Sequence, residues 1–281
     1  MARVYNFNPG PAALPLPVLQ KCQAELVEYP GSGMSLLEMS HRSKEFEAIL
    51  NETQNLFREL MGLPSSYHIL FLGGGASLQF AMIPMNFIPA GGSADYIVTG
   101  EWAKRAYKEA TIVGQAHIAA SSEDKQFSYL PDAATFELDP KAAYVHITSN
   151  NTIYGTQWPT YPDVQGRPLL VDLSSDMLCR QTDFTRFAMM YAGAQKNLGP
   201  AGVTVVFIRE EFAATANKGL STMLSYETHI KNNSLYNTPP AFAIYLVKLV
   251  LEWIKGQGGV GAVEADRKST RLNSSHRIRS R

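Results

Sequence analysis

The 281-residue sequence has no long apolar stretch free of charge, which a membrane-spanning helix would need. Its first residues also lack the basic and then apolar layout of a secretory signal peptide. Two cysteines, Cys22 and Cys179, are too few for a disulfide framework, and neither has a His or Cys neighbour at metal-ligand spacing. We therefore expect a cytoplasmic protein with no membrane partner, no structural disulfide and no metal site.

Charge of one sign is also not in excess, because 25 Lys and Arg residues balance 25 Asp and Glu residues. Residues 267–281 hold six of the basic side chains and no acid, so the preceding part of the chain is mildly acidic. An acidic body offers no basic face to nucleic acid, which we do not expect as a partner. Residues 266–281 are polar and without apolar periodicity, and we expect a disordered, non-native tail there.

The rest of the chain has the length and apolar content of a packed enzyme domain. Proline and glycine mark residues 1–15 as an irregular arm, and residues 16–265 form the expected domain. Within it, short apolar runs alternate with helical or looping links, which favours an α/β fold with a mostly parallel sheet between helices. We predict helices over residues 18–28, from a Ser43 cap to about Gly62, and over residues 242–254.

Lys196 lies in a turn of small residues between two strand-like apolar runs. A solvated surface lysine is the ordinary interpretation. However, Ala192, Gly193, Ala194 and Gly199 leave room for a flat ligand against the backbone. A buried lysine amine can form a Schiff base with a carbonyl or with pyridoxal phosphate (PLP), so Lys196 is a candidate catalytic residue.

Two upstream segments offer the other groups that PLP needs. Asp172 follows the apolar run Leu169–Val171, where it can partner a pyridine nitrogen, although a cap or turn aspartate is the ordinary interpretation. Gly73-Gly-Gly-Ala-Ser77 lies between a strand pattern and a helix pattern, which suits either a small phosphate site or a plain tight turn. The segment lacks the spacing of a P-loop or of a dinucleotide-binding loop.

Several motifs resemble, in the same order along the chain, those of the phosphoserine aminotransferases, which are class V, fold-type I PLP-dependent enzymes. They are Tyr5-Asn-Phe-Asn-Pro-Gly-Pro-Ala12, Met39-Ser-His-Arg-Ser43, Gly73-Gly-Gly-Ala-Ser-Leu-Gln-Phe80, Thr99-Gly-Glu-Trp102, Ser149-Asn-Asn-Thr152, Val171-Asp-Leu-Ser-Ser-Asp176 and Gly193-Ala-Gln-Lys-Asn197. The resemblance covers roughly residues 1 to 265 and implies a three-layer α/β/α large domain.

The resemblance also implies roles for individual residues. Lys196 would bind PLP as a Schiff base and move protons, and Asp172 would hold the pyridine nitrogen protonated. Other cofactor contacts would come from Gly75, Ala76, Ser77 and Gln195 at the phosphate, Trp102 on the ring face and Thr152 at the phenolic oxygen. Asn237 and Thr238 would reach the phosphate of a partner subunit, which implies a homodimer with shared sites. His41 and Arg42 would bind the substrate.

The reaction implied by the resemblance interconverts O-phospho-L-serine and 2-oxoglutarate with 3-phosphohydroxypyruvate and L-glutamate in L-serine biosynthesis. 4-Phosphohydroxy-L-threonine, in pyridoxine biosynthesis, is a possible second substrate. The C-terminal small domain of the family and its substrate arginine are missing, and Ala76 stands where some members have arginine. We therefore expect part of the helix over residues 242–254 to be uncovered. The alternatives are an inactive PLP-binding fragment and a cysteine desulfurase, for which Cys22 and Cys179 are poorly placed.

Overall fold

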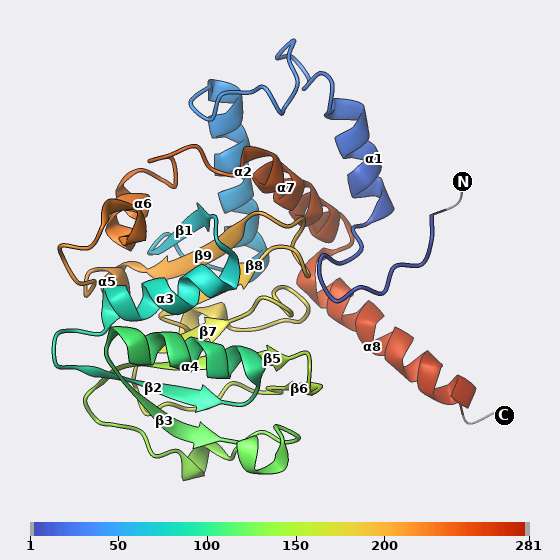
Figure 1. Ribbon diagram of the computed structural model, residues 1–281. Helices are drawn as coiled ribbons and strands as arrows, with labels where there is room; N and C mark the ends of the chain where they lie inside the picture. Colours follow the sequence, from blue (N-terminus) through green and yellow to red (C-terminus); the bar gives the residue numbers. More distant parts are fainter. Residues whose placement is uncertain (1–2, 279–281) are drawn as a thin grey trace.

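A seven-stranded sheet forms the centre of the protein (Figure 1). The computed structural model describes residues 3–278, with side chains described through residue 269. Across the sheet the strand order is β1-β9-β8-β7-β4-β2-β3, and β9 alone runs antiparallel to its neighbours. The strands are β1 (Tyr67–Leu72), β2 (Ser93–Val98), β3 (Gln115–Ser121), β4 (Ala142–Thr148), β7 (Leu169–Asp172), β8 (Met189–Gly193) and β9 (Thr204–Arg209). This confirms the predicted α/β class with a mostly parallel sheet.

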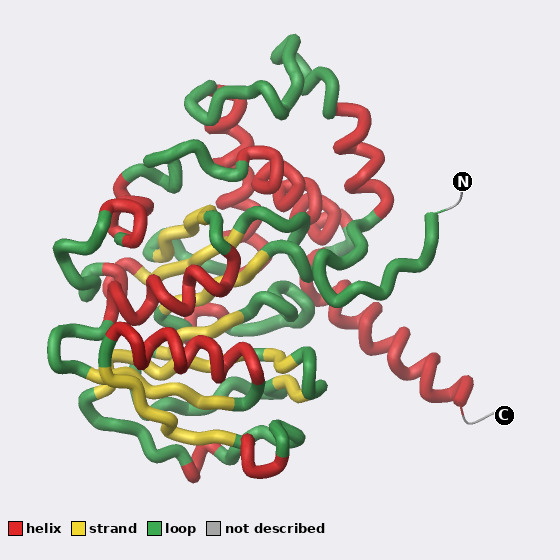
Figure 2. Tube along the Cα trace, viewed as in Figure 1, coloured by secondary structure: helices red, strands yellow, loops and turns green. Residues whose placement is uncertain are grey.

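Helices cover both faces of this sheet, as Figures 1 and 2 show. One face packs against α3 (Gly75–Phe87) and α4 (Glu101–Val113), and the other against α2 (Lys44–Met61) and α7 (Ala241–Gly256). The remaining helices are α1 (Leu16–Glu25), α5 (Glu210–Ala213), α6 (Tyr226–Lys231) and α8 (Gly259–Ile278). A short hairpin, β5 (Asn150–Asn151) and β6 (Thr156–Gln157), follows β4. Among residues 3–278, no helix is both long and apolar enough to cross a membrane.

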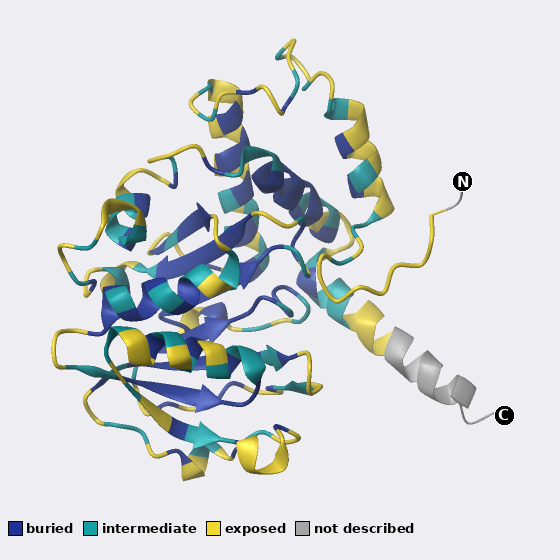
Figure 3. Ribbon diagram, in the orientation of Figure 1, coloured by how far each residue is buried: buried dark blue, intermediate teal, exposed yellow. Residues whose placement is uncertain are grey.

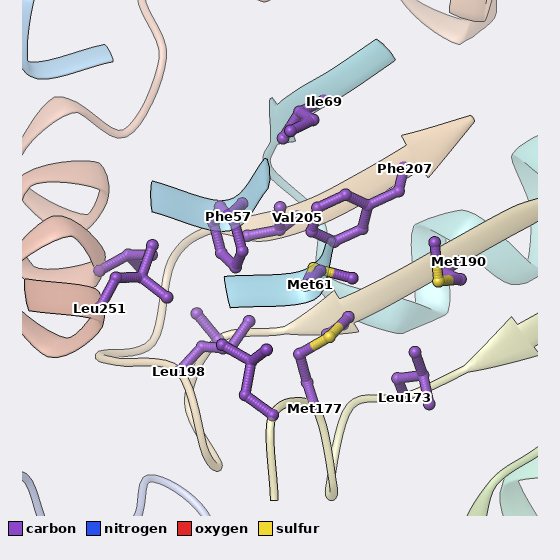
Figure 4. Close-up of a cluster of buried hydrophobic side chains, with 14 of the residues drawn as sticks. Phe57, Met61, Ile69, Leu173, Met177, Met190, Leu198, Val205, Phe207 and Leu251 are labelled. Carbon is purple, nitrogen blue, oxygen red and sulfur yellow. The ribbon is translucent and has the colours of Figure 1, made fainter. Parts of the chain in front are cut away.

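Alternating side chains of the strands supply the two cores, because successive residues of a strand point to opposite faces. Val205 and Phe207 of β9 meet Phe57 and Met61 of α2 in the core shown in Figure 4. The intervening Val206 faces the other core, with Tyr191 of β8. The side chains of both cores are almost fully buried, and the strands at the centre of the sheet are coloured as buried in Figure 3.

Helix α2 begins and ends as the sequence predicts. The Ser43 hydroxyl accepts a hydrogen bond from the Phe46 backbone N–H at 3.2 Å, which satisfies one free donor of the first turn. Gly62 follows the last helical residue with φ at +64°, a conformation that glycine adopts without steric cost. Between these ends, Phe46, Ile49 and Leu50 turn one face towards the core.

The expectation that the helix following Pro240 would be partly uncovered is wrong. Helix α7 lies between α2 and α1, and nearly all its apolar side chains are buried. Even Lys248 is buried on this helix, where its ammonium pairs with Glu52 of α2 at 2.9 Å and with Glu252 at 2.8 Å. Burial lowers the pKa of Lys248, but the hydrogen bonds with the two glutamates outweigh burial and the pKa is raised. The large domain therefore covers this helix by itself.

The disordered, non-native tail expected over residues 266–281 stays a prediction. Helix α8 continues through residues 266–278, while residues 279–281 lie outside the described part of the chain. Its first turns are attached to the domain: Val260 is buried, and the Glu264 carboxylate accepts the Gln181 backbone N–H at 2.9 Å. Farther along, α8 projects away from the domain (Figure 1).

Candidate active site

A cavity of about 170 Å³ opens at the edge of the sheet where the parallel strands end. Asp172 is the last residue of β7, Thr148 is the last of β4, and Lys196 follows β8 by three residues. Ligands of α/β sheets bind at this edge because the loops there converge. The full lining is Gly75, Ala76, Ser77, Trp102, Thr148, Asn150, Asp172, Ser174, Ser175, Gln195 and Lys196.

Asp172 is almost fully buried, yet its carboxylate is well supported. One oxygen accepts the Ser174 backbone N–H at 2.9 Å, and the Ser149 hydroxyl donates to the Asp172 carbonyl at 2.8 Å. Burial raises the pKa of Asp172, while the bonds with Ser174 and the nearby Lys196 charge act in the opposite direction. A buried acid of this kind gains from a cationic partner in the cavity.

Lys196 is half-buried and lies between an aromatic ring and the N-terminal arm. Its ammonium is 5.3 Å from the centre of the Trp102 ring, a cation–π distance. Gly10 of the arm is so close to the side chain that an added Cβ would lie 3.3 Å from the Lys196 Cγ. The Ala12 backbone N–H donates to the Gln195 carbonyl at 2.8 Å and fastens the arm there. The arm thus forms one wall around the lysine.

The glycine loop starts α3, and Gly75, Ala76 and Ser77 of the first turn line the cavity. Gly74 and Gly75 have φ of +83° and +65°, which side-chain-bearing residues rarely adopt. Nothing lies within 4 Å of a Cβ built on Gly75, so the backbone there is open to a ligand. The first N–H groups of a helix lack intrahelical partners and attract anions, which suits a phosphate.

Two buried polar atoms of the residues that line the cavity, Trp102 Nε1 and Thr148 Oγ1, have no hydrogen-bond partner in the described part of the chain. Buried polar groups are normally satisfied, so both atoms indicate space for a polar ligand. With an acid, an amine, an aromatic ring and a helix N-terminus around one space, the cavity fits the PLP that the sequence resemblance implies.

Comparison with known proteins agrees with this geometry. The family model "Aminotransferase class-V" matches residues 4–281. The phosphoserine aminotransferase of Niallia circulans is 54% identical over 271 residues, which cover 96% of this chain and 75% of the relative. That of Desulfosudis oleivorans is 52% identical over 265 residues, covering 94% and 73%. The chain belongs to the phosphoserine aminotransferase family.

Solved structures of this family superpose closely on the chain. The phosphoserine aminotransferase from Bacillus circulans subsp. alkalophilus has a TM-score of 0.94 at 53% identity, covering 97% of this chain and 76% of that one. PLP-bound phosphoserine aminotransferase from Trichomonas vaginalis has a TM-score of 0.86 at 37% identity, covering 95% and 75%. The chain therefore spans about three quarters of the length of its relatives in this family.

Seven of the residues predicted for the cofactor lie together in the cavity. They are Gly75, Ala76, Ser77, Trp102, Asp172, Gln195 and Lys196. Thr152 is not among them, because it is exposed in the turn of the β5–β6 hairpin. Thr148 and Asn150, just before it in the chain, line the cavity instead.

The other predicted site residues lie outside this cavity. Asn237 and Thr238 are exposed and line a separate hollow of about 520 Å³ beside the glycine loop and α6. Arg42 is exposed just before α2, and His41 has a buried Nε2 without a hydrogen-bond partner. The described residues of one chain therefore do not bring these four to Lys196.

Sequence reasoning missed four lining residues: Thr148, Asn150, Ser174 and Ser175. Ser174 had a recognisable signal, since an aspartate two residues before a serine in a turn often accepts its backbone N–H. The Ser174 hydroxyl in turn accepts the Gly193 backbone N–H at 3.1 Å and links the ends of β7 and β8. The sequence alone contains no comparable signal for Asn150.

Buried aromatic side chains, including Tyr191 and His146, lie next to Asp172 in the sheet. Thr148, Asp172 and Tyr191 are direct neighbours across three strands. The Tyr191 hydroxyl is 2.8 Å from His146 Nε2, and burial lowers the pKa of His146 to about 3. The imidazole is therefore neutral at physiological pH, so this layer adds no positive charge beneath the carboxylate.

Proposed function

We propose that this chain transfers the amino group between O-phosphoserine and 2-oxoglutarate through PLP. The observation that carries the proposal is the convergence of Lys196, Asp172 and Trp102 on one cavity at the carboxyl edge of the sheet. The relatives show the family of this chain, and we propose the roles of its individual residues.

The cavity walls would hold PLP by three kinds of contact. The N-terminus of α3, with Gly75 to Ser77, binds the phosphate, and Trp102 covers the ring face. Asp172 binds the pyridine nitrogen as an ion pair, which compensates the cost of its burial. When bound, PLP withdraws electrons from the substrate carbon that loses its proton.

Lys196 carries out the proton transfers. Its Nζ would take the proton from the substrate Cα and later donate a proton to the carbon that receives the amino group. Gly10 near the Lys196 Cγ and Trp102 near Nζ restrict the conformations of the lysine side chain, so the amine is kept near the reacting atoms. The backbone bond from Ala12 to Gln195 supports the same geometry.

A second copy of the chain completes the site in this proposal. Asn237 and Thr238 are exposed and polar, and they would reach the phosphate of the partner's PLP in a homodimer with two-fold symmetry. His41 and Arg42 would bind the acidic groups of the substrate, a task for which a planar guanidinium is suited. Both cysteines are free, which agrees with our proposal of a cytoplasmic location.

A second candidate function is PLP binding without catalysis. It is favoured by one observation: Lys196 is the only cationic side chain among the described residues that line the cavity. A doubly charged substrate phosphate would then have no cationic partner other than Lys196 among the described residues that line the cavity.

One assay separates the two functions. Purified protein loaded with PLP is given O-phosphoserine and 2-oxoglutarate, and glutamate is measured over time, with Lys196→Ala as the control. The proposal expects glutamate from the original protein and none above background from the variant. PLP bound at Lys196 without glutamate formation would support the binding-only function.

A further inference from the structure

Three arginines line a second cavity, of about 470 Å³, at the opposite edge of the sheet from Lys196. Arg167 precedes β7, Arg186 precedes β8, and Arg209 ends β9. Strand β7 joins the two sites, since Leu169 at its start lines the arginine cavity and Asp172 at its end lines the other. The two cavities are thus roughly 10 Å apart along this strand, at ~3.3 Å per residue.

Each of the three guanidinium groups is held by main-chain carbonyls. Arg209 donates to the carbonyl of Phe187 at 3.0 Å and to that of Thr185. Arg167 donates through Nε to the Asp139 carbonyl at 3.0 Å, and Arg186 makes one long bond of 3.4 Å to the Tyr161 carbonyl. Arg209, which also donates to the Tyr67 hydroxyl, and Arg167 are held in place by their bonds, whereas Arg186 is held only weakly. Each group keeps N–H donors that have no hydrogen bond among the described residues.

None of the three arginines pairs with a carboxylate in the part of the chain that the structure describes. Asp163 and Glu211 also line the cavity, so three positive groups face two negative ones. The cavity therefore has a positive excess. Arginines left without carboxylates around one hollow are typical of a site for an oxyanion, which a guanidinium binds through paired N–H donors.

The apolar part of the lining indicates what kind of anion fits. Val164, Leu169 and Phe212 form one part of the wall next to the charged groups. A free inorganic ion would use the arginines alone, whereas a small organic phosphate would also cover this apolar surface. We propose that the cavity is a second binding site, separate from the Lys196 pocket, for a small molecule that carries a phosphate group.

The test uses PLP-loaded protein, so that the cofactor occupies its own phosphate site, and inorganic phosphate as the probe in a calorimetric titration. Arg186→Gln is the main variant, because Arg186 is exposed and makes only one weak bond to the fold. We expect its Kd for phosphate to rise roughly tenfold or more, the usual effect of removing one charged hydrogen-bond partner. Turnover and the thermal midpoint without phosphate should stay unchanged.

Two controls distinguish this site from other sources of phosphate binding. Lys108→Gln removes an exposed positive charge elsewhere and should leave the Kd unchanged. Arg42→Gln removes a proposed substrate contact and should also leave it unchanged. The inference is overturned if the original protein shows no saturable phosphate binding, if Lys108→Gln weakens binding as much as Arg186→Gln, or if Arg42→Gln alone weakens it.

Discussion

Cofactor contacts are predicted both in the Lys196 cavity and in the loop with Asn237 and Thr238. A single chain brings together only the residues of the Lys196 cavity. Asp172 is buried and hydrogen-bonded, and Lys196 is held between Trp102 and the arm. Asn237 and Thr238 instead are exposed, and the Asn237 amide makes one weak bond of 3.4 Å to its neighbour's carbonyl. The difference fits our proposal that the chemistry is built into one chain and that a second copy adds part of the PLP affinity.

Replacing Lys196 by Ala should have the largest effect of the changes considered. It removes both the covalent link to PLP and the group that moves protons, so we expect turnover to fall by about 10⁴-fold or more. Some PLP should remain bound, since Asp172 and the N-terminus of α3 do not depend on that link. Borohydride reduction and peptide mapping of the original protein should find the pyridoxyl label on Lys196. A label on Lys104 or Lys231 would show that the wrong lysine has been assigned.

Asp172→Asn should have the next largest effect, because it keeps the size of the side chain and removes the charge at the pyridine nitrogen. We expect turnover to fall by roughly two to four orders of magnitude, the scale of losing one preorganised electrostatic partner. Asp176→Asn is the matched comparison, since this neighbouring acid is also buried but bonds to Ser149 and Gln157. Near-normal turnover in Asp172→Asn together with a large loss in Asp176→Asn would reverse the assignment.

The same substitution should stabilise the protein when PLP has been removed. Burial raises the pKa of Asp172, so the unfolded chain loses this proton at a lower pH than the folded one. The charged group therefore destabilises the fold above its unfolded pKa of about 4, and the penalty grows as pH rises towards the folded pKa. The melting temperature of PLP-free Asp172→Asn should exceed that of the original protein at pH 7, with a smaller gap at pH 5. Equal melting temperatures at both values would show that Asp172 carries no burial penalty.

The sequence predicted the residues of the cavity that follow directly from strand ends and turn chemistry. Asp172 and the glycine loop lie at the carboxyl edge because parallel strands must deliver their loops there. Thr152 was placed by resemblance alone, and the structure has it on the exposed turn of the β5–β6 hairpin, while Thr148 and Asn150 line the cavity. Which hairpin residue faces inward depends on pairing such as Asn151 with Thr156, and local propensity does not encode that pairing.

The sequence also could not predict that α1 and α2 cover α7. An apolar helix predicts burial, but whether a later domain or the existing helices bury it depends on tertiary packing. The Lys248–Glu252 pair follows from helical i,i+4 spacing, but the pair of Lys248 with Glu52 joins residues far apart in the chain, and no periodicity identifies it. The antiparallel direction of β9 is a similar case, since its apolar sequence suits either direction.

The difference between the Lys196 cavity and the exposed Asn237 and Thr238 can be tested by changing these two residues together to Ala. If these residues bind the phosphate of a partner's PLP, PLP affinity should fall about tenfold at concentrations where the protein is dimeric. The loss should disappear on dilution to monomer, as followed by light scattering and PLP fluorescence. Asn232→Ala is the control, because this asparagine is exposed nearby and its amide bonds only to the Thr228 carbonyl. A loss that persists in the monomer would mean that the two residues act within one chain.

The smallest expected effect concerns the wall that the N-terminal arm forms beside Lys196. Gly10→Ala would place a methyl group 3.3 Å from the Lys196 Cγ and 3.7 Å from the Gln195 Cγ, so the lysine must shift by a few tenths of an ångström. Since misplacing a catalytic group by about 1 Å can cost 10²-fold, a shift of this size should lower turnover roughly three- to tenfold and leave PLP affinity unchanged. Gly256→Ala is the control, since nothing lies within 4 Å of a Cβ there. If Gly10→Ala kept full turnover, the arm would be a passive cover, and the position of Lys196 would depend on Trp102 and the strand ends alone.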